Sequence, residues 1–148
     1  MRATVILIDT NVVSELMRPE PARTVLDWFA AQESTELFLS AVSEAELRTG
    51  AAILPAGKRR DSLTAIIDSM IEEDFAGRVL SFDSAAAKAY AVIAAVRHAA
   101  GRPIMEADCQ IAAIASVQGA AVATRNVTDF EGCGITIIDP WHGVASRP

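Results

Sequence analysis

The amino-acid sequence predicts an α/β fold built around a mostly parallel sheet. Short continuous apolar runs, typical of strands buried on both faces, alternate with longer segments whose apolar residues have helical spacing. No repeat, low-complexity block or long linker divides the 148 residues, and 51% of them are hydrophobic. This length and composition are typical of one folded domain.

The first half of the chain contains two of the five expected strands, over residues 5–8 and 37–39. A helix over residues 12–17, ended by two prolines, and a second helix over residues 24–31 are expected between these strands. The first strand ends where the sequence changes from apolar to polar, so its carboxyl end is well defined.

A further helix is expected to begin near Ser43, because Ser43 and Glu46 have the spacing of a capping box. Gly50 or Pro55 could interrupt it. Helical spacing then resumes over residues 63–71, so two helices are expected between the second and third strands.

The second half of the chain continues the alternation. Three more strands are expected over residues 79–82, 121–124 and 135–138, separated by an alanine-rich helix capped by Asp83 or Ser84 and closed by Gly101, and by a helix opened by Pro103 and stopped by Gly119. Residues 144–148 are interpreted as a flexible C-terminal tail.

The formal net charge of −6 argues against a protein that coats DNA, since such proteins are usually strongly basic. Cys109 and Cys133 form no CxxC pair, which excludes the usual zinc spacing and agrees with a reducing, cytoplasmic location. Cys109 is interpreted as core packing. The apolar start of the chain is too short for a signal peptide, and no run approaches the roughly 20 residues of a membrane span.

Polar side chains follow the expected strands at the edge where parallel sheets bind ligands. Asp9 follows the first strand, Glu46 lies early in the helix after the second, and Asn126 and Asp129 follow the fourth. Asp108 lies on the apolar face of its expected helix, where a carboxylate is costly unless positive charge meets it. The helix N-terminus supplies part of that charge, and a metal ion would supply more.

Each acidic residue also has a purely structural interpretation. Asp9 could cap a helix, Glu46 could complete the capping box, Asp108 could complement a helix dipole, and Asp129 could form a turn. Their convergence at one edge favours a shared role. Carboxylates without Cys or His are hard oxygen ligands, which suit Mg²⁺ or Mn²⁺. The expected chemistry is therefore metal-assisted phosphodiester hydrolysis, with an adjacent carboxylate orienting or deprotonating the attacking water.

Four segments of the chain resemble, in order, the motifs of PIN domains, specifically those of VapC toxins of bacterial toxin–antitoxin pairs in their FitB-like branch. These segments are LIDTNVVSE at residues 7–15, LSAVSEAELRTG at 39–50, ADCQIAA at 107–113 and ATRNVTDF at 123–130. Pro140 and Trp141 resemble the usual ending of that branch. The resemblance covers nearly the whole chain.

The resemblance implies a three-layer PIN domain over residues 1–143, with sheet order 3-2-1-4-5, and an Mg²⁺-dependent endoribonuclease in which Mn²⁺ could replace Mg²⁺. Asp9 and Asp108 would be the metal ligands. The catalytic set would comprise Asp9, Glu46, Asp108, Asn126 and Asp129, supported by Thr10, Asn11, Thr124 and Arg125. The implied partners are a VapB-like or FitA-like antitoxin, an RNA substrate, DNA only through the antitoxin, and a second copy of the chain, with no membrane.

One position departs from the family pattern. Some members carry aspartate where this chain has Asn126, and Asp129 is a candidate to replace it. The alternative hypothesis is a catalytically impaired PIN domain that acts as an antitoxin-binding module. A haloacid-dehalogenase-type phosphatase would need Asp-x-Asp, whereas Asn11 stands at the second position after Asp9.

The remaining charged and aromatic residues are given structural interpretations. Solvated surface charge is expected for Arg48, Arg97, Arg102 and the basic step at residues 58–60, core or interface packing for Trp28 and Trp141, and surface positions for His98 and His142.

Overall fold

The computed structural model describes residues 4–146 and confirms the alternating α/β architecture. Its elements, in chain order, are β1 (Ile6–Ile8), α1 (Thr10–Leu16), α2 (Arg23–Ala30), the 3₁₀ turn η1 (Ser34–Glu36), β2 (Leu37–Ser40), α3 (Ala41–Ala52), α4 (Lys58–Ser69), the π-helical turn η2 (Met70–Asp74), β3 (Val79–Leu80), α5 (Ser84–Ala99), α6 (Glu106–Gln118), β4 (Ala121–Ala123), α7 (Val127–Phe130), β5 (Ile137–Asp139) and β6 (Val144–Ser146).

The sheet has the strand order β3-β2-β1-β4-β5-β6, and its first five strands are parallel. The predicted order 3-2-1-4-5 is therefore confirmed. In the central strand, Ile8 lies opposite Leu39 of β2 and Ala123 of β4. The residues that follow these three positions consequently emerge together at the carboxyl edge of the sheet.

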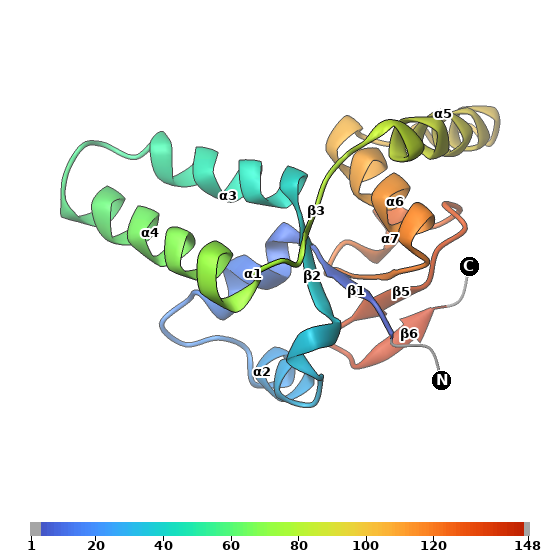
Figure 1. Cartoon of the computed structure of the whole chain (residues 1–148). Coiled ribbons are helices and arrows are strands. Elements are labelled where there is room, and N and C mark those ends of the chain that lie inside the picture. Colours follow the sequence, from blue (N-terminus) through green and yellow to red (C-terminus); the bar gives the residue numbers. More distant parts are fainter. Residues whose placement is uncertain (1–3, 147–148) are drawn as a thin grey trace.

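Helices cover both faces of the sheet, which gives the three expected layers (Figure 1). Because side chains alternate along a strand, Leu7 of β1 packs into the core beneath α5 and α6. Its neighbours Ile6 and Ile8 pack into a second core with residues of α1, α2, α3 and α4. The sheet thus separates two apolar cores, and its polar strand ends lie between the helices of both.

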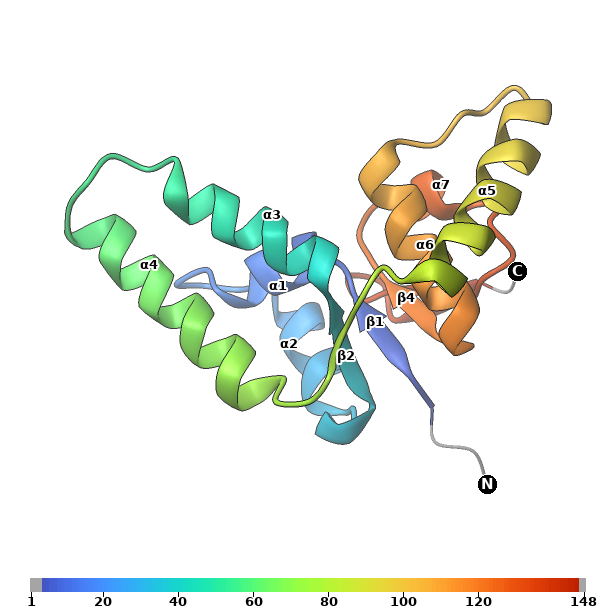
Figure 2. The same ribbon diagram turned by 45° about the horizontal axis from the view of Figure 1, so that its top comes forward.

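Helices α3 and α4 form a hairpin that extends away from the sheet, as both views show (Figures 1 and 2). Arg48 of α3 ties the two helices together, since its guanidinium contacts Glu44 at 2.8 Å and Asp68 of α4 at 2.7 Å. The prediction of a freely solvated Arg48 is therefore wrong in detail, because this side chain bridges two helices.

The start of α3 corrects one sequence prediction. The helix begins at Ala41, and its N-cap is Ser40, whose hydroxyl oxygen accepts a hydrogen bond from the amide of Ser43 at 3.0 Å. The chain enters the helix directly from β2, so Ser40 takes the extended conformation that a cap requires. Ser43 lies inside the helix, and Glu46 is not a capping-box partner. Gly50 does not interrupt the helix either.

Two other boundaries also differ from expectation. Helix α6 begins at Glu106 rather than at Pro103, because Met105 is still extended; Ile104 therefore precedes the helix and does not share a helical face with Asp108. The flexible tail expected from residue 144 is wrong for Val144–Ser146, which forms β6. This strand pairs antiparallel with β5, where it satisfies backbone groups of that strand. Residues 147–148 lie outside the described part.

The corrected cap predicts opposite outcomes for two neighbouring serines. Ser40→Ala should destabilise the protein by about 1 kcal/mol, because an amide of the first turn of α3 loses its buried acceptor. Ser43→Ala should leave stability within about 0.5 kcal/mol of wild type or raise it, since the Ser43 hydroxyl is buried with no hydrogen-bond partner in the described chain. Urea unfolding of both variants measures this. A larger loss of stability in Ser43→Ala than in Ser40→Ala would contradict this assignment and support the predicted capping box of Ser43 and Glu46.

Candidate active site

Asp9 stands at the carboxyl end of β1 and caps α1, with only 5% of its surface exposed. Its carboxylate accepts three hydrogen bonds, from the Thr10 amide at 2.8 Å, the Thr124 hydroxyl at 2.8 Å and the Asn11 side-chain amide at 3.2 Å. A carboxylate has about four acceptor positions, so Oδ1, which accepts only from Thr10, keeps one free. Burial raises the pKa of Asp9, and these three donors oppose that shift.

A polar network joins the ends of β1 and β4. The fully buried Thr124 hydroxyl donates to Asp9 and accepts from the Asn126 amide at 3.0 Å and the Asn11 side chain at 3.3 Å. The Asn11 carbonyl oxygen in turn accepts from the Arg125 amide at 3.1 Å. Thr124 and Asn11 therefore fix the orientation of Asp9, because each bonds both the carboxylate and the loop after β4.

Three of the four predicted acidic residues, Asp9, Glu46 and Asp108, come together around a cavity of about 470 Å³ at this edge of the sheet. Its lining consists of Asp9, Thr10, Asn11, Ser14, Glu15, Arg18, Glu46, Asp108 and Asn126. Glu46 is exposed and is held in place by the Thr10 hydroxyl, which donates to Glu46 Oε1 at 2.7 Å. Of the predicted residues, Asp129, Thr124 and Arg125 do not line the cavity.

Asp108 lies in the first turn of α6, half-buried, and its carboxylate accepts no hydrogen bond from the described residues. Burial and the charges of Asp9, Asp129 and Glu46 raise the pKa of Asp108 to about 6, while Arg97 lowers it. Three other carboxylates therefore lie close enough for their charges to act on Asp108. Such a cluster holds unfavourable negative charge, which a cation would relieve.

Asn126 and Asp129 have different positions. Asn126 lines the cavity and caps α7, but its side chain carries no charge. Asp129 is exposed on α7 and acts on Asp108 through its charge, although it does not reach the cavity wall. The structure thus brings Asn126, and not Asp129, into the lining beside Asp9.

Arg97 was predicted to be a surface residue, and that prediction is wrong. It is 6% exposed, and its guanidinium donates to the main-chain oxygens of Arg102 at 2.6 Å, Asp129 at 2.9 Å and Glu131 at 2.9 Å. These bonds join the segment that leads into α6 to the segment that follows α7. Arg97 therefore fixes the elements carrying Asp108 and Asp129 relative to each other.

The sequence did contain a signal for this buried arginine. Ala86, Tyr90, Ile93 and Arg97 follow one another at helical spacing, so Arg97 continues the inward stripe of α5. A cation on an apolar stripe is stable when carbonyl oxygens bind it, and such acceptors cannot be seen in a sequence. Arg102, in contrast, is half-exposed beside Glu131 at 3.6 Å.

The other sequence assignments fall outside the cavity lining. Cys109 is fully buried, as expected, and burial raises the pKa of its thiol to about 11, so it is no nucleophile at neutral pH. Trp28 and Trp141 pack against the core of α1 to α4, and the Arg125 guanidinium lies 5.0 Å from the centre of the Trp141 ring. His98 and His142 are exposed, as predicted.

A divalent cation fits the donor set of the cavity, although not as a closed cage. Within residues 4–146, no three Asp, Glu, His or Cys side chains stand close enough to enclose an ion. Mg²⁺ usually binds one or two protein carboxylates and completes its shell with water and substrate phosphate. Free oxygens remain on Asp9, Asp108 and Glu46, which is the hard-oxygen chemistry that this mode of binding needs.

The chain is similar to known proteins over most of its length. The PIN domain family model matches residues 6–131. Over 137 residues and 93% of its length, the chain is 49% identical to plasmid stability protein StbB of Pseudomonas syringae pv. tomato, of which 99% is covered. It is 46% identical to VapC ribonuclease Y4jK of Sinorhizobium fredii over the same share, with 98% of that protein covered.

Two solved structures share the fold. FitAcB from Neisseria gonorrhoeae has a chain with a TM-score of 0.88 and 39% identity, covering 93% of this chain and 99% of that chain. FitAB bound to an IR36 DNA fragment has a TM-score of 0.89 and 38% identity, covering 93% and 96%. No helix in residues 4–146 is both long and apolar enough to cross a membrane.

The raised pKa of Asp108 predicts a pH-dependent cost to stability. Because its folded pKa of about 6 exceeds the ordinary value of 3.8, the stabilising contribution of the protonated form is complete below pH 3.8 and is lost as pH rises through 6. Asp108→Asn should therefore stabilise the metal-free protein by about 1 to 2 kcal/mol above pH 7, allowing for partial exposure, and by little near pH 4. Urea unfolding in EDTA across this range measures the difference. A constant difference would contradict the assignment.

Proposed function

The chain belongs to the PIN-domain family, and from that premise we propose that it is the toxin of a toxin–antitoxin pair and cleaves RNA. The observation that carries the proposal is the acidic cavity, where Asp9, Glu46 and Asp108 meet at the carboxyl edge of the sheet. Relatives that match nearly the whole chain carry the names VapC ribonuclease and plasmid stability protein.

The proposed partner is an antitoxin of the FitA or VapB type. Chains with this fold occur in the FitAcB and FitAB structures, and FitAB is bound to DNA. This chain has a formal charge of −6 and lacks the basic composition typical of a protein that coats DNA. We therefore propose that the antitoxin makes the contacts to DNA, and that this chain is held at the DNA only through the antitoxin.

Asp9 and Asp108 are the proposed ligands of an Mg²⁺ ion, with Mn²⁺ as a substitute. Both line the cavity, and each retains free oxygen lone pairs. When bound, the ion supplies polarisation of the phosphate and stabilises charge on the leaving oxygen. Thr124, Asn11 and the Thr10 amide hold the Asp9 carboxylate in one orientation, so little reordering is needed when a ligand arrives.

Glu46 is the proposed proton acceptor. The Thr10 hydroxyl occupies Oε1 and leaves Oε2 able to take a proton from the attacking water. The water oxygen bonds to phosphorus, the bond from phosphorus to the leaving ribose oxygen breaks, and that oxygen takes a proton from solvent water. Asn126, on the cavity lining, offers amide hydrogens to a phosphate oxygen rather than a further negative charge.

The alternative is a PIN domain that docks the antitoxin without cleaving RNA. The uncharged Asn126 on the cavity wall favours this alternative, because it removes one possible carboxylate from the site. The two hypotheses differ in what the isolated chain does, since only the nuclease would degrade RNA when its partner is missing.

We expect the chain, expressed without a partner, to arrest growth and cleave RNA, and Asp9→Asn to reduce cleavage by roughly a hundredfold or more. Asparagine keeps the size and capping ability of Asp9 but lacks its charge. Calorimetry should show weak Mn²⁺ binding that Asp108→Ala weakens by about tenfold or more.

Thermal unfolding of both variants serves as the control for folding. Equal growth arrest by wild type and Asp9→Asn would contradict the nuclease proposal. Unchanged Mn²⁺ affinity in Asp108→Ala would remove Asp108 from the metal site, whereas absence of cleavage by a folded, metal-loaded wild type would favour the docking alternative.

We also propose that the free chain is a homodimer. Val92 and Val96, one turn apart on α5, are exposed and offer apolar surface for such contact. Light scattering should give about twice the 15.7 kDa mass of one chain. A monomer mass at tens of micromolar would contradict this.

A further inference from the structure

A second cavity adjoins the acidic one. It measures about 450 Å³ and lies between α1, α3 and α4. Four residues, Thr10, Ser14, Arg18 and Glu46, line both cavities. Because these four residues line both, the two cavities are direct neighbours, and a ligand long enough to cross their shared edge would reach both.

The lining of this second cavity combines an apolar wall with two cations. Its wall includes Leu47, Leu54, Leu63 and Ile67, from α3, the loop that follows it and α4. Arg18 and Arg59 are the basic side chains of its lining. The sequence pattern alone had assigned Arg59 to a solvated basic step, whereas the structure places it on this cavity.

Both guanidinium groups are able to bind an anion. Arg18 is anchored through Nη1 to Glu15 at 3.2 Å, yet its side chain remains 64% exposed. Glu15 is itself buried and fixed by the Ala22 amide at 2.8 Å, so the anchor is rigid. Arg59 is exposed and makes no hydrogen bond or ion pair with any described residue. Two such cations beside a carboxylate cavity complement a polyanion that must also reach those carboxylates.

We propose that the second cavity is a nucleotide subsite of the RNA substrate. It holds the nucleoside next to the scissile phosphate, with the base against the apolar wall and the adjoining phosphate contacted by Arg18 and Arg59. The inference rests on the proposed RNA cleavage. The faces of all four bases are apolar enough to pack on such a wall, so the subsite favours single-stranded RNA with an unstacked base.

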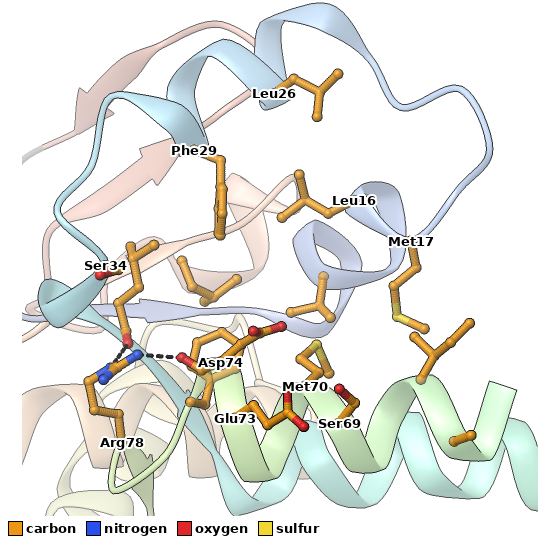
Figure 3. Close-up of a pocket in the computed structure, with 16 residues that line it drawn as sticks. Leu16, Met17, Leu26, Phe29, Ser34, Ser69, Met70, Glu73, Asp74 and Arg78 are labelled. Atoms are coloured by element: carbon orange, nitrogen blue, oxygen red, sulfur yellow. Dashed lines mark hydrogen bonds between the residues drawn. The ribbon is translucent and has the colours of Figure 1, made fainter.

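A larger groove of about 1070 Å³ lacks these features (Figure 3). Leu16, Phe29 and Met70 are among the residues that line it. Its one basic side chain, Arg78, is turned to the main chain, because it donates to the carbonyl oxygens of Leu37 at 3.0 Å and of Asp74. Glu73 and Asp74 also lie on its border. This groove shares no residue with the acidic cavity and repels phosphate, so the RNA is assigned to the smaller hollow.

Gly50 provides a test that blocks the subsite without disturbing the fold. It lines the cavity from α3, and a Cβ added there meets nothing within 4 Å. Gly50 borders this cavity and one other, so Gly50→Leu adds bulk at the edge of the subsite. It should raise KM for a single-stranded RNA by about tenfold, with kcat changed less than about twofold. Gly50→Ala is the matched control and should cleave like wild type.

Arg59→Ala tests the charge contact in the same assay. It should raise KM by about five- to tenfold and reduce the slope of log binding against log salt by about one, because one phosphate contact is lost. Its neighbour Lys58 does not line the cavity, so Lys58→Ala removes the same charge as a control. RNA binding is measured on the Asp9→Asn background, and Mn²⁺ calorimetry should give wild-type affinity for every subsite variant.

The outcomes separate this inference from the function on which it rests. Wild-type cleavage with unchanged KM in both Gly50→Leu and Arg59→Ala would overturn the subsite and leave the nuclease intact. Unchanged KM with weaker inhibition by the antitoxin would overturn it in favour of a protein-docking cavity. A folded wild type that cleaves no RNA would overturn both proposals. Equal losses of RNA affinity in Lys58→Ala and Arg59→Ala would overturn the assigned contact of Arg59 in the cavity, because the effect would then come from net charge alone.

Discussion

The site depends on the burial of one carboxylate at the end of the central strand. Asp9 is almost fully enclosed, and a buried charge is tolerated only where donors replace its lost water. The Thr10 amide and the Asn11 side chain supply two donors from α1, and Thr124, which follows β4, supplies the third, so the cost of burying Asp9 is fully offset only when β1 and β4 are paired. Pairing of β1 with β4 therefore completes the site, and burial together with the charges of Asp9, Asp129 and Glu46 raises the pKa of the neighbouring Asp108.

The sequence predicted those parts of the fold and site that local patterns determine. Strand ends could be located because apolar runs stop abruptly, as at Asp9, and parallel strands present their ends at one edge. That rule predicted the meeting of Asp9 and Glu46, and the apolar helical face around Asp108 indicated a third carboxylate; all three line one cavity. The rule did not hold for Asp129. This residue lies on α7, which begins after Asn126, and it does not line the cavity.

The features that the sequence did not predict depend on tertiary contacts. Ser40 and Ser43 are both reasonable caps by composition, and the direct passage from β2 into α3 selects the former. By sequence alone Arg97 is assigned to the surface, but in the fold it donates to the carbonyl oxygen of nearby Arg102 and to those of Asp129 and Glu131, which lie 32 and 34 residues further along the chain. Arg59 likewise lines the second cavity only because the hairpin of α3 and α4 packs beside α1. For Arg97 and Arg59 the deciding partners include residues remote in the chain, whereas for Ser40 the deciding feature is the strand that precedes it.

The short edge strands of the sheet affect how copies of the chain can associate. At one margin β3 contributes only Val79–Leu80, and at the other β6 contributes Val144–Ser146. An exposed edge strand can pair with strands of other chains, as in aggregates. A very short edge strand has too few unpaired backbone groups to hold an added strand in register. Growth by strand addition is thereby disfavoured, which leaves the helical surfaces for orderly association even when newly made chains are crowded together.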